Sequence, residues 1–204
     1  MPSGDSGEPA TSDSQSNYDA FLIFKGDVKH FSFVSHLCRA LVDSGLRTFG
    51  EDDGVQRKEN MKVEIERVIK GSKVPIVVVV LSEDYASSIW CLDELVMILE
   101  IKKISGLVVL PVFYNVDPSD VRKQTGRFGE AFAKYEGNEW RGKVDGWRAA
   151  LKEVADLAGM SLWNQAHGLV KPSSFLVIIF SKYEVEVGRT IDRRTFLKTG
   201  EDYL

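Results

Sequence analysis

The stretch VPIVVVVLSEDYASSIWCLDEL, residues 74–95, decides the fold. It opens with a continuous apolar run over residues 74–81, the pattern of a strand whose two faces are both covered. A polar segment comes next, and an apolar helix is then predicted to run to about Ile104, where Gly106 breaks it. A buried strand that leads into a helix is typical of a parallel α/β sheet, with residues 74–81 as the central strand.

The same alternation of strand and helix continues on both sides of this stretch. The sequence predicts further strands over residues 18–24, 46–49 and 107–114, again as apolar runs. It predicts a helix over residues 31–44, which Gly45 closes. The buried stripe of this helix consists of Val34, Leu37, Cys38 and Leu41.

Three more helical patterns complete the chain. One comes after the loop GEDDGVQRKEN and ends at Gly71. Two others come after the turn NVDPSD, and the second of them ends at Gly159. Their buried stripes are formed by Met61, Ile65, Val68 and Ile69 in the first, and by Trp140, Val144, Trp147, Leu151, Val154 and Ala158 in the last.

Composition limits the function classes. The chain has 204 residues, of which 44% are hydrophobic and 27% charged, as expected for one globular domain with tails. A net charge of -4 gives no global case for binding nucleic acid or an anionic membrane, although a local basic patch stays open. The cysteines and histidines show no metal-ligand spacing, so no metal site is expected.

The ends of the chain give no targeting signal. Residues 1–17 are polar and have neither a basic nor an apolar signal region, so a disordered leader is predicted. The longest apolar runs, residues 74–81 and 175–180, are too short to span a bilayer. These observations predict a cytoplasmic protein without a membrane partner, and they leave nuclear entry open.

Glu94 is the residue of SSIWCLDEL that points to chemistry. Its neighbours one helical turn away are Trp90, Cys91, Met97 and Ile98, all apolar or nearly so, and such surroundings favour a perturbed carboxyl group. A structural explanation is also open and, from the local pattern alone, preferred. The two acidic residues, 93 and 94, would complement the positive end of the helix dipole, with Ser87 or Ser88 as N-cap and Trp90 in the core.

Several segments together resemble, in order and spacing, a plant Toll/interleukin receptor (TIR) domain. The resemblance covers residues 18 to about 162 and is carried by YDAFLIFKGD, FVSHL, TFGEDDGVQRKEN, SEDYASSIWCLDEL and LPVFYNVDPSDVRKQTG. It implies a flavodoxin-like, five-stranded parallel sheet with helices on both faces. Its ligand cleft is expected beyond the carboxyl ends of the strands, where the loops after the first three strands converge.

The resemblance also implies an activity. In this family the cleft hydrolyses NAD and releases nicotinamide, so NAD is a substrate and no cofactor is implied. The catalytic glutamate lies in the motif W-C-x-x-E-L, which is WCLDEL here, and Glu94 takes that role. A single carboxylate suffices, because nicotinamide leaves as a neutral molecule and the oxocarbenium-like ribose needs only a nearby negative charge.

Further residues acquire binding roles from the same resemblance. The loop with Lys25 and Gly26 and the loop from Asp53 to Arg57 would frame the dinucleotide, with both basic side chains near phosphate. Ser88 and Trp90 would line the ribose end. Structural explanations stay open for each of them: solvated loop charges, turn geometry at Gly26, a helix cap at Ser88 and a core position for Trp90.

Members of the family associate with one another, and association assembles the active cleft. Ser35 and His36 match one association surface, formed by the first and last helices, and their spacing places them off the buried stripe. Gly159 matches a second surface, although a helix terminator would explain this glycine equally well. The resemblance therefore implies homo-oligomers or hetero-oligomers with other TIR domains.

The chain departs from the family pattern at three places. Lys25 stands where an arginine is usual, and lysine lacks the planar fork of arginine. Lys58 replaces a glycine. Residues 163–204 contain Pro172 and β-branched runs in place of a last amphipathic helix, so a divergent tail of strand or irregular structure is predicted.

The TIR domain at residues 18–162 has two functional hypotheses. The first is an NAD hydrolase that acts in plant immune and cell-death signalling through self-association, with activity weakened by the loop substitutions. The second, which the departures favour, is a non-catalytic adaptor or decoy that pairs with other TIR-containing receptors through Ser35 and His36.

Overall fold

A computed structural model describes residues 18–25, 31–49, 57–70, 74–137 and 139–163 of the chain, with the backbone alone at residues 31, 32 and 57–60. Its centre is a five-stranded parallel sheet in the order β2-β1-β3-β4-β5. The strands are β1 (Ala20–Phe24), β2 (Thr48–Phe49), β3 (Ile76–Leu81), β4 (Val108–Tyr114) and β5 (Met160–Leu162). This order is the flavodoxin-like one, so the predicted fold is confirmed.

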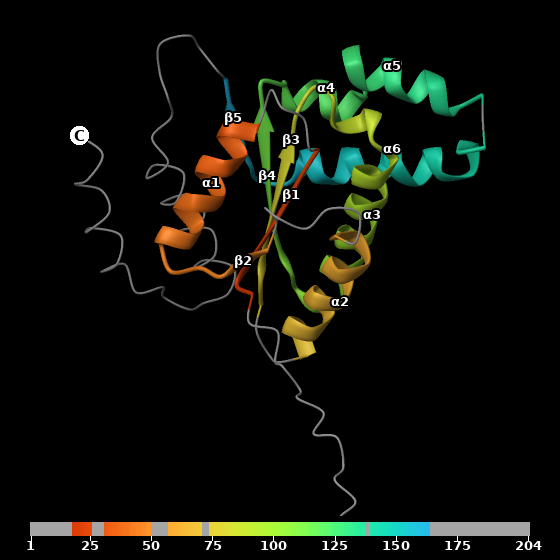
Figure 1. The fold of residues 1–204 in the computed structure, drawn as a ribbon. Helices are drawn as coiled ribbons and strands as arrows, with labels where there is room; N and C mark the ends of the chain where they lie inside the picture. Colours follow the sequence, from red (N-terminus) through yellow and green to blue (C-terminus); the bar gives the residue numbers. More distant parts are fainter. Residues whose placement is uncertain (1–17, 26–30, 50–56, 71–73, 138, 164–204) are drawn as a thin grey trace, which may run out of the picture.

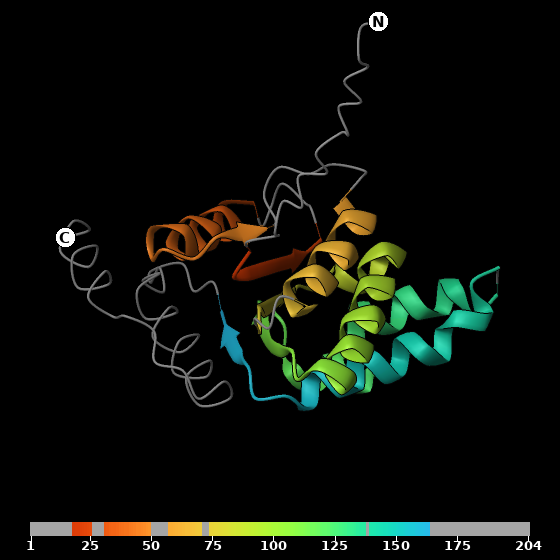
Figure 2. The ribbon, with the colours of Figure 1, turned by 90° about the horizontal axis from the view of Figure 1, so that it is seen from below.

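Helices cover both faces of the sheet (Figures 1 and 2). Helix α1 (Phe31–Asp43) lies on one face. The other face carries α2 (Arg57–Lys70), α3 (Ile89–Ser105), α4 (Pro118–Lys123), α5 (Gly126–Tyr135) and α6 (Arg141–Asp156). A short 3-10 helix, η1 (Tyr85–Ser87), joins β3 to α3. Helix α3, which contains Glu94, therefore lies on the more heavily covered face of the sheet.

The position of the central strand β3 explains why its sequence is apolar throughout. All six of its residues are buried. Val77, Val79 and Leu81 pack towards α2, α3 and α6, whereas Ile76, Val78 and Val80 pack towards α1. Because successive side chains of a strand point to opposite faces, a strand that is covered on both faces has to be apolar throughout. The apolar run at residues 74–81 was thus a sound basis for predicting the central strand.

Two glycines end helices as predicted. Gly45 comes after α1 with φ of 85°, and Gly106 comes after α3 with φ of 69°, a left-handed conformation that residues with a Cβ rarely adopt. The predictions for residues 1–17, for Gly71 and for residues 164–204 lie outside the described residues.

The turn predicted at NVDPSD is in part a helix. Pro118 occupies the first turn of α4, and the Asp117 side chain accepts a hydrogen bond from the Ser119 backbone N–H at 2.7 Å. Proline and aspartate favour both turns and helix starts, because proline has no backbone N–H to satisfy and aspartate supplies an acceptor for a neighbouring N–H. The sequence pattern therefore predicted the break in the chain correctly but missed the short helix α4 that begins there.

Gly159 is not the terminator of α6. The helix ends at Asp156, and the next residue, Leu157, is extended, with ψ of 147°. A Cβ on Gly159 would lie only 2.5 Å from the carbonyl oxygen of Pro111 in β4. The glycine is needed because the chain leading into β5 passes against the backbone of β4, which no local sequence pattern reveals.

Candidate active site

The candidate site begins where α3 starts, directly after β3 and η1. Ser88 is the N-cap, and its hydroxyl oxygen accepts a hydrogen bond from the Cys91 backbone N–H at 3.3 Å. This contact satisfies one of the N–H groups that a first helical turn leaves without an intrahelical acceptor. The capping role considered for Ser88 is thus observed, and it fixes the start of the helix that carries Glu94.

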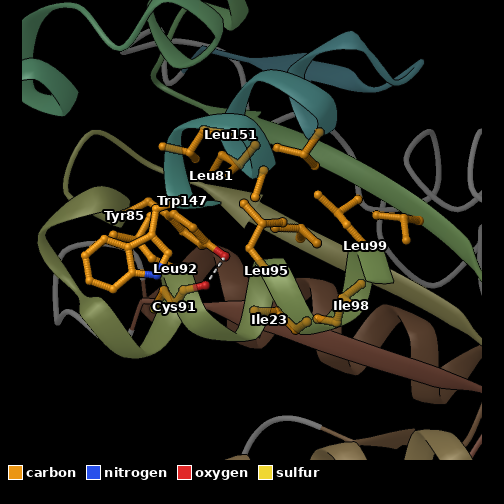
Figure 3. Packing of buried hydrophobic residues seen from close by; sticks show 14 of the residues in the cluster. Ile23, Leu81, Tyr85, Cys91, Leu92, Leu95, Ile98, Leu99, Trp147 and Leu151 are labelled. Atoms are coloured by element: carbon orange, nitrogen blue, oxygen red, sulfur yellow. Dashed lines mark hydrogen bonds between the residues drawn. The ribbon is translucent and has the colours of Figure 1, made fainter. Parts of the chain in front are cut away.

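Two buried tyrosines hold the junction between η1 and α3. The Tyr85 hydroxyl donates to the Cys91 carbonyl oxygen at 3.1 Å, the bond drawn in Figure 3. The Tyr135 hydroxyl of α5 donates to the Ala86 carbonyl oxygen at 3.0 Å. Burial raises the pKa of Tyr135 above its ordinary value of 10.0, and the nearby Cys91 adds to this. The phenol therefore remains a protonated donor throughout the neutral pH range.

Glu94 lies on the second turn of α3 and is 6% exposed. Among the residues that the structure describes, it is the one charged residue that is buried. Cys91 and Ile98, one turn away on either side, are buried as well, whereas Trp90 is 63% exposed. Two of the four apolar neighbours expected for Glu94 are thus buried, and the structural explanation that placed Trp90 in the core is wrong.

Asp93, the residue before Glu94, is tied to α6. Its carboxylate accepts hydrogen bonds from the Trp147 indole Nε1 and from the Lys143 ammonium group, both at 2.9 Å. The explanation that Asp93 simply complements the helix dipole therefore misses these partners. They lie about fifty residues further along the chain, and nothing in the local pattern marked Asp93 as their acceptor.

The end of β1 meets the same junction. The Lys25 ammonium group donates to the Ser87 hydroxyl at 2.8 Å, and the Cys91 thiol lies 3.9 Å from the Phe24 carbonyl oxygen. The structure thus brings Lys25 next to the segment that contains Ser88 and Trp90, at the carboxyl ends of neighbouring strands. The substrate-binding roles of these three residues stay predictions.

The structure does not test the positions of the other predicted substrate-binding residues. Gly26 and Asp53 lie outside the described residues, and so does most of the loop that would frame the dinucleotide. Arg57 begins α2, but its side chain is not described.

The predicted association residues lie on two separate parts of the surface. On α1, His36 is exposed and Ser35 is half-buried, so only His36 fully meets the expectation of a position near solvent. Among the described side chains, the Ser35 hydroxyl is buried without a hydrogen-bond partner. Gly159 lies beyond α6 against β4. Their roles in self-association stay predictions.

The structure also bears on two other kinds of site. Within the described ranges, no group of three or more His, Cys, Asp or Glu side chains could hold a metal ion. None of the helices seen in this part of the chain is both long enough and apolar enough to cross a membrane.

Comparison with known proteins identifies the family. The model of the TIR domain family matches residues 17–171. Disease resistance protein RPV1 from Vitis rotundifolia is 50% identical over 145 residues, 71% of this chain and 10% of that protein. TMV resistance protein N from Nicotiana glutinosa is 41% identical over 153 residues, 74% of this chain and 13% of that protein. The chain thus spans only about a tenth of these relatives.

A solved structure agrees with the sequence matches. It is the TIR-domain part of the activated Roq1 resistosome directly recognizing the pathogen effector XopQ. The TM-score is 0.67 at 44% identity, and the match covers 80% of this chain and 99% of that chain. A family model that covers most of the chain, close relatives and the shared parallel fold lead to one conclusion: the chain belongs to the TIR domain family.

Proposed function

We propose that this TIR domain hydrolyses NAD, releases nicotinamide and acts in plant immune and cell-death signalling through self-association. The observation that supports the proposal most is the burial of Glu94 on the first turns of α3. Removing a carboxylate from water costs free energy, so such groups are uncommon in protein interiors and concentrate at functional sites. The residue that is buried here is the one that the family motif designates as catalytic.

The proposed reaction needs one negative charge near the ribose and no general acid, because nicotinamide leaves as a neutral molecule. The bond between ribose C1′ and the nicotinamide ring nitrogen breaks, and its electron pair neutralises the positive ring. Water then adds to C1′ and loses a proton, which completes the hydrolysis. The Glu94 carboxylate would stabilise the positive ribose as the bond breaks. Lys25, Gly26, Asp53 and Arg57 would hold the phosphates and backbone of NAD, and Ser88 and Trp90 the ribose.

The low exposure of Glu94 adds a requirement. Because the whole Glu94 residue is only 6% exposed, a molecule as large as NAD would reach it only if the surrounding chain opened. Association of TIR domains is the event to which we assign this opening, since the structural relative is an activated resistosome. Ser35, His36 and Gly159 would contribute to the contacts, and activity should rise more steeply than in proportion to protein concentration.

The test compares the wild-type chain with Glu94→Gln at several concentrations, with nicotinamide measured by chromatography after incubation with NAD. Glutamine has almost the same shape as glutamate, so this variant removes the charge and keeps the packing. Wild type should release nicotinamide and the variant should not, while Glu100→Gln, on an exposed part of the same helix, should behave as wild type. Equal release by wild type and Glu94→Gln would remove Glu94 from the mechanism.

A second candidate function is a non-catalytic adaptor or decoy that pairs with other TIR-containing immune receptors. The engagement of Lys25 by Ser87 favours it, because this predicted phosphate-binding side chain already has a hydrogen-bond partner. Co-precipitation with a full-length TIR receptor should then persist in Glu94→Gln and disappear when Ser35 and His36 are both changed to Ala. Arg39→Ala, an exposed change on the same helix, is the control. Binding that survives the double change would exclude this surface.

A further inference from the structure

The contact between Asp93 and α6 joins two helices at the residue next to Glu94. One carboxylate oxygen of Asp93 faces the Trp147 indole N–H, and the other faces the Lys143 ammonium group. Both donors come from α6, one turn apart. Asp93 is thus held by two charge-assisted hydrogen bonds from a single rigid element, which fix the direction of its side chain.

The α6 side of this contact is itself firmly packed. Trp147 is 1% exposed, and its ring contacts those of Tyr135 and Trp140 at centroid distances of 5.3 and 6.4 Å. Figure 3 shows Trp147 among the buried side chains between α6 and α3, with Leu92 and Leu95 of α3. A buried indole N–H needs an acceptor, and the partly buried carboxylate of Asp93 provides it.

Adjacent residues of a helix have a fixed angular relation, because each residue turns the helix by about 100° and advances it by about 1.5 Å. A contact that fixes the rotation of α3 at Asp93 therefore also fixes the direction in which Glu94 leaves the helix. The Ser88 cap and the Tyr85 hydroxyl hold the start of the helix but lie on the turn before. Leu92 and Leu95, both 0% exposed, pack the same turns against the core, and the contact with α6 adds two directional hydrogen bonds at Asp93.

We propose that Asp93 is a positioning residue for Glu94, and that the Asp93–Trp147 hydrogen bond sets the direction of the Glu94 carboxylate relative to the ribose. The inference rests on the proposed hydrolase function. It assigns α6 an indirect part in catalysis, since a partner that shifts α6 would change the direction of the Glu94 carboxylate relative to the ribose. A misplacement on the order of 1 Å at a reacting group reduces turnover by up to about a hundredfold.

The test uses variants that separate orientation from stability. Asp93→Ala removes both hydrogen bonds, Asp93→Asn keeps an oxygen that accepts from Trp147, and Lys143→Met removes only the ammonium group. Glu100→Ala is the matched control on the exposed part of α3. All are assayed with the full chain at a temperature at which circular dichroism shows each variant to be folded.

Turnover and KM for NAD distinguish the two roles. Asp93→Ala should lower kcat by about tenfold or more with KM little changed, as expected for a misdirected group that acts on the reacting atoms. Asp93→Asn should recover most of the loss, and Lys143→Met and Glu100→Ala should remain close to wild type. A wild-type kcat in folded Asp93→Ala, with Glu94→Gln inactive, would overturn the positioning role and leave the hydrolase proposal intact.

A second measurement does not depend on activity. In ¹H–¹⁵N spectra, the backbone amide signals of Ile98 and Leu99, one turn beyond Glu94 on α3, should shift in Asp93→Ala and stay near their wild-type positions in Asp93→Asn. If the wild-type chain releases no nicotinamide, the hydrolase proposal fails, and these signals still decide whether Asp93 orients the turn. Unchanged signals in Asp93→Ala would overturn the orientation by Asp93 in either case.

Discussion

At the scale of residues, Asp93 and Glu94 show how neighbours on one helix acquire different roles. Asp93 uses its carboxylate to bind two donors from α6, whereas Glu94 lies on the side of α3 near Cys91, towards the end of β1. The motif designated Glu94 from the sequence alone. The role of Asp93 needed the fold, because its donors are remote in sequence and become adjacent only when α6 packs on α3.

Gly159 gives a residue-scale prediction. In Gly159→Ala the new methyl group would meet the Pro111 carbonyl oxygen and ring, so the chain leading into β5 has to move. We expect a loss of about 1–3 kcal/mol in the free energy of unfolding, the usual cost of overpacking. Urea unfolding monitored by circular dichroism measures it.

Gly146→Ala is the matched control for this prediction. Gly146 lies within α6, and a Cβ there would meet no atom within 4 Å. Alanine should therefore stabilise the chain by about 0.5–1 kcal/mol through helix propensity. A Gly159→Ala variant as stable as wild type would contradict the clash and restore a purely intermolecular explanation for this glycine.

At the scale of elements, the sequence predicted the start or end of a helix correctly where a single capping or terminating residue determines it. Gly45, Gly106 and the Ser88 cap behave as their types predict. α4 was missed because proline and aspartate give the same signal for a turn and for a helix start. β5 has just three residues and forms by pairing with β4. Its own residues are too few to show the sequence pattern of a strand.

The start of α4 gives an element-scale prediction on pH. Hydrogen bonds from Ser119 lower the pKa of Asp117 below its ordinary value of 3.8, and Lys123 and Arg122 add to this. A lowered pKa in the folded state means that the capping contact stabilises the fold above the unfolded-state pKa. This contribution is lost as the pH falls through the folded-state pKa.

Asp117→Asn tests this dependence, because asparagine is a good cap and does not titrate. The stability advantage of wild type over Asp117→Asn should be present near neutral pH and should shrink once the pH falls below 3.8. Urea midpoints of both proteins across this range provide the measurement. An advantage that stays constant on acidification would show that the charge of Asp117 is not coupled to folding.

At the scale of the whole molecule, the apolar runs predicted a parallel α/β sheet because strands covered on both faces exclude polar residues. The strand order came from the resemblance to TIR domains, and the structure confirms it. The cleft itself could not be predicted from apolar patterns. It depends on loops after β1 and β2 that lie outside the described residues, so the sequence placed its residues by motif alone.

The layered sheet predicts a gradient of hydrogen exchange. Amides of β3, which is buried on both faces and paired on both sides, should exchange most slowly, close to the rate set by global unfolding. Amides of β2 and β5 should exchange faster, since they are short and lie at the margins of the sheet. Exchange monitored by NMR on the folded chain gives the order, and equal protection of β2 and β3 would contradict it.

The brevity of the two outer strands has a consequence for assembly. In the described part of the chain, the sheet closes with a strand of two residues on one side and of three on the other. So few backbone amides and carbonyls offer almost no template for a neighbouring chain to extend the sheet, a common route to fibrils. Among the described residues, the self-association proposed above would therefore depend on helix and loop side chains, whose shapes and charges can select one partner over another.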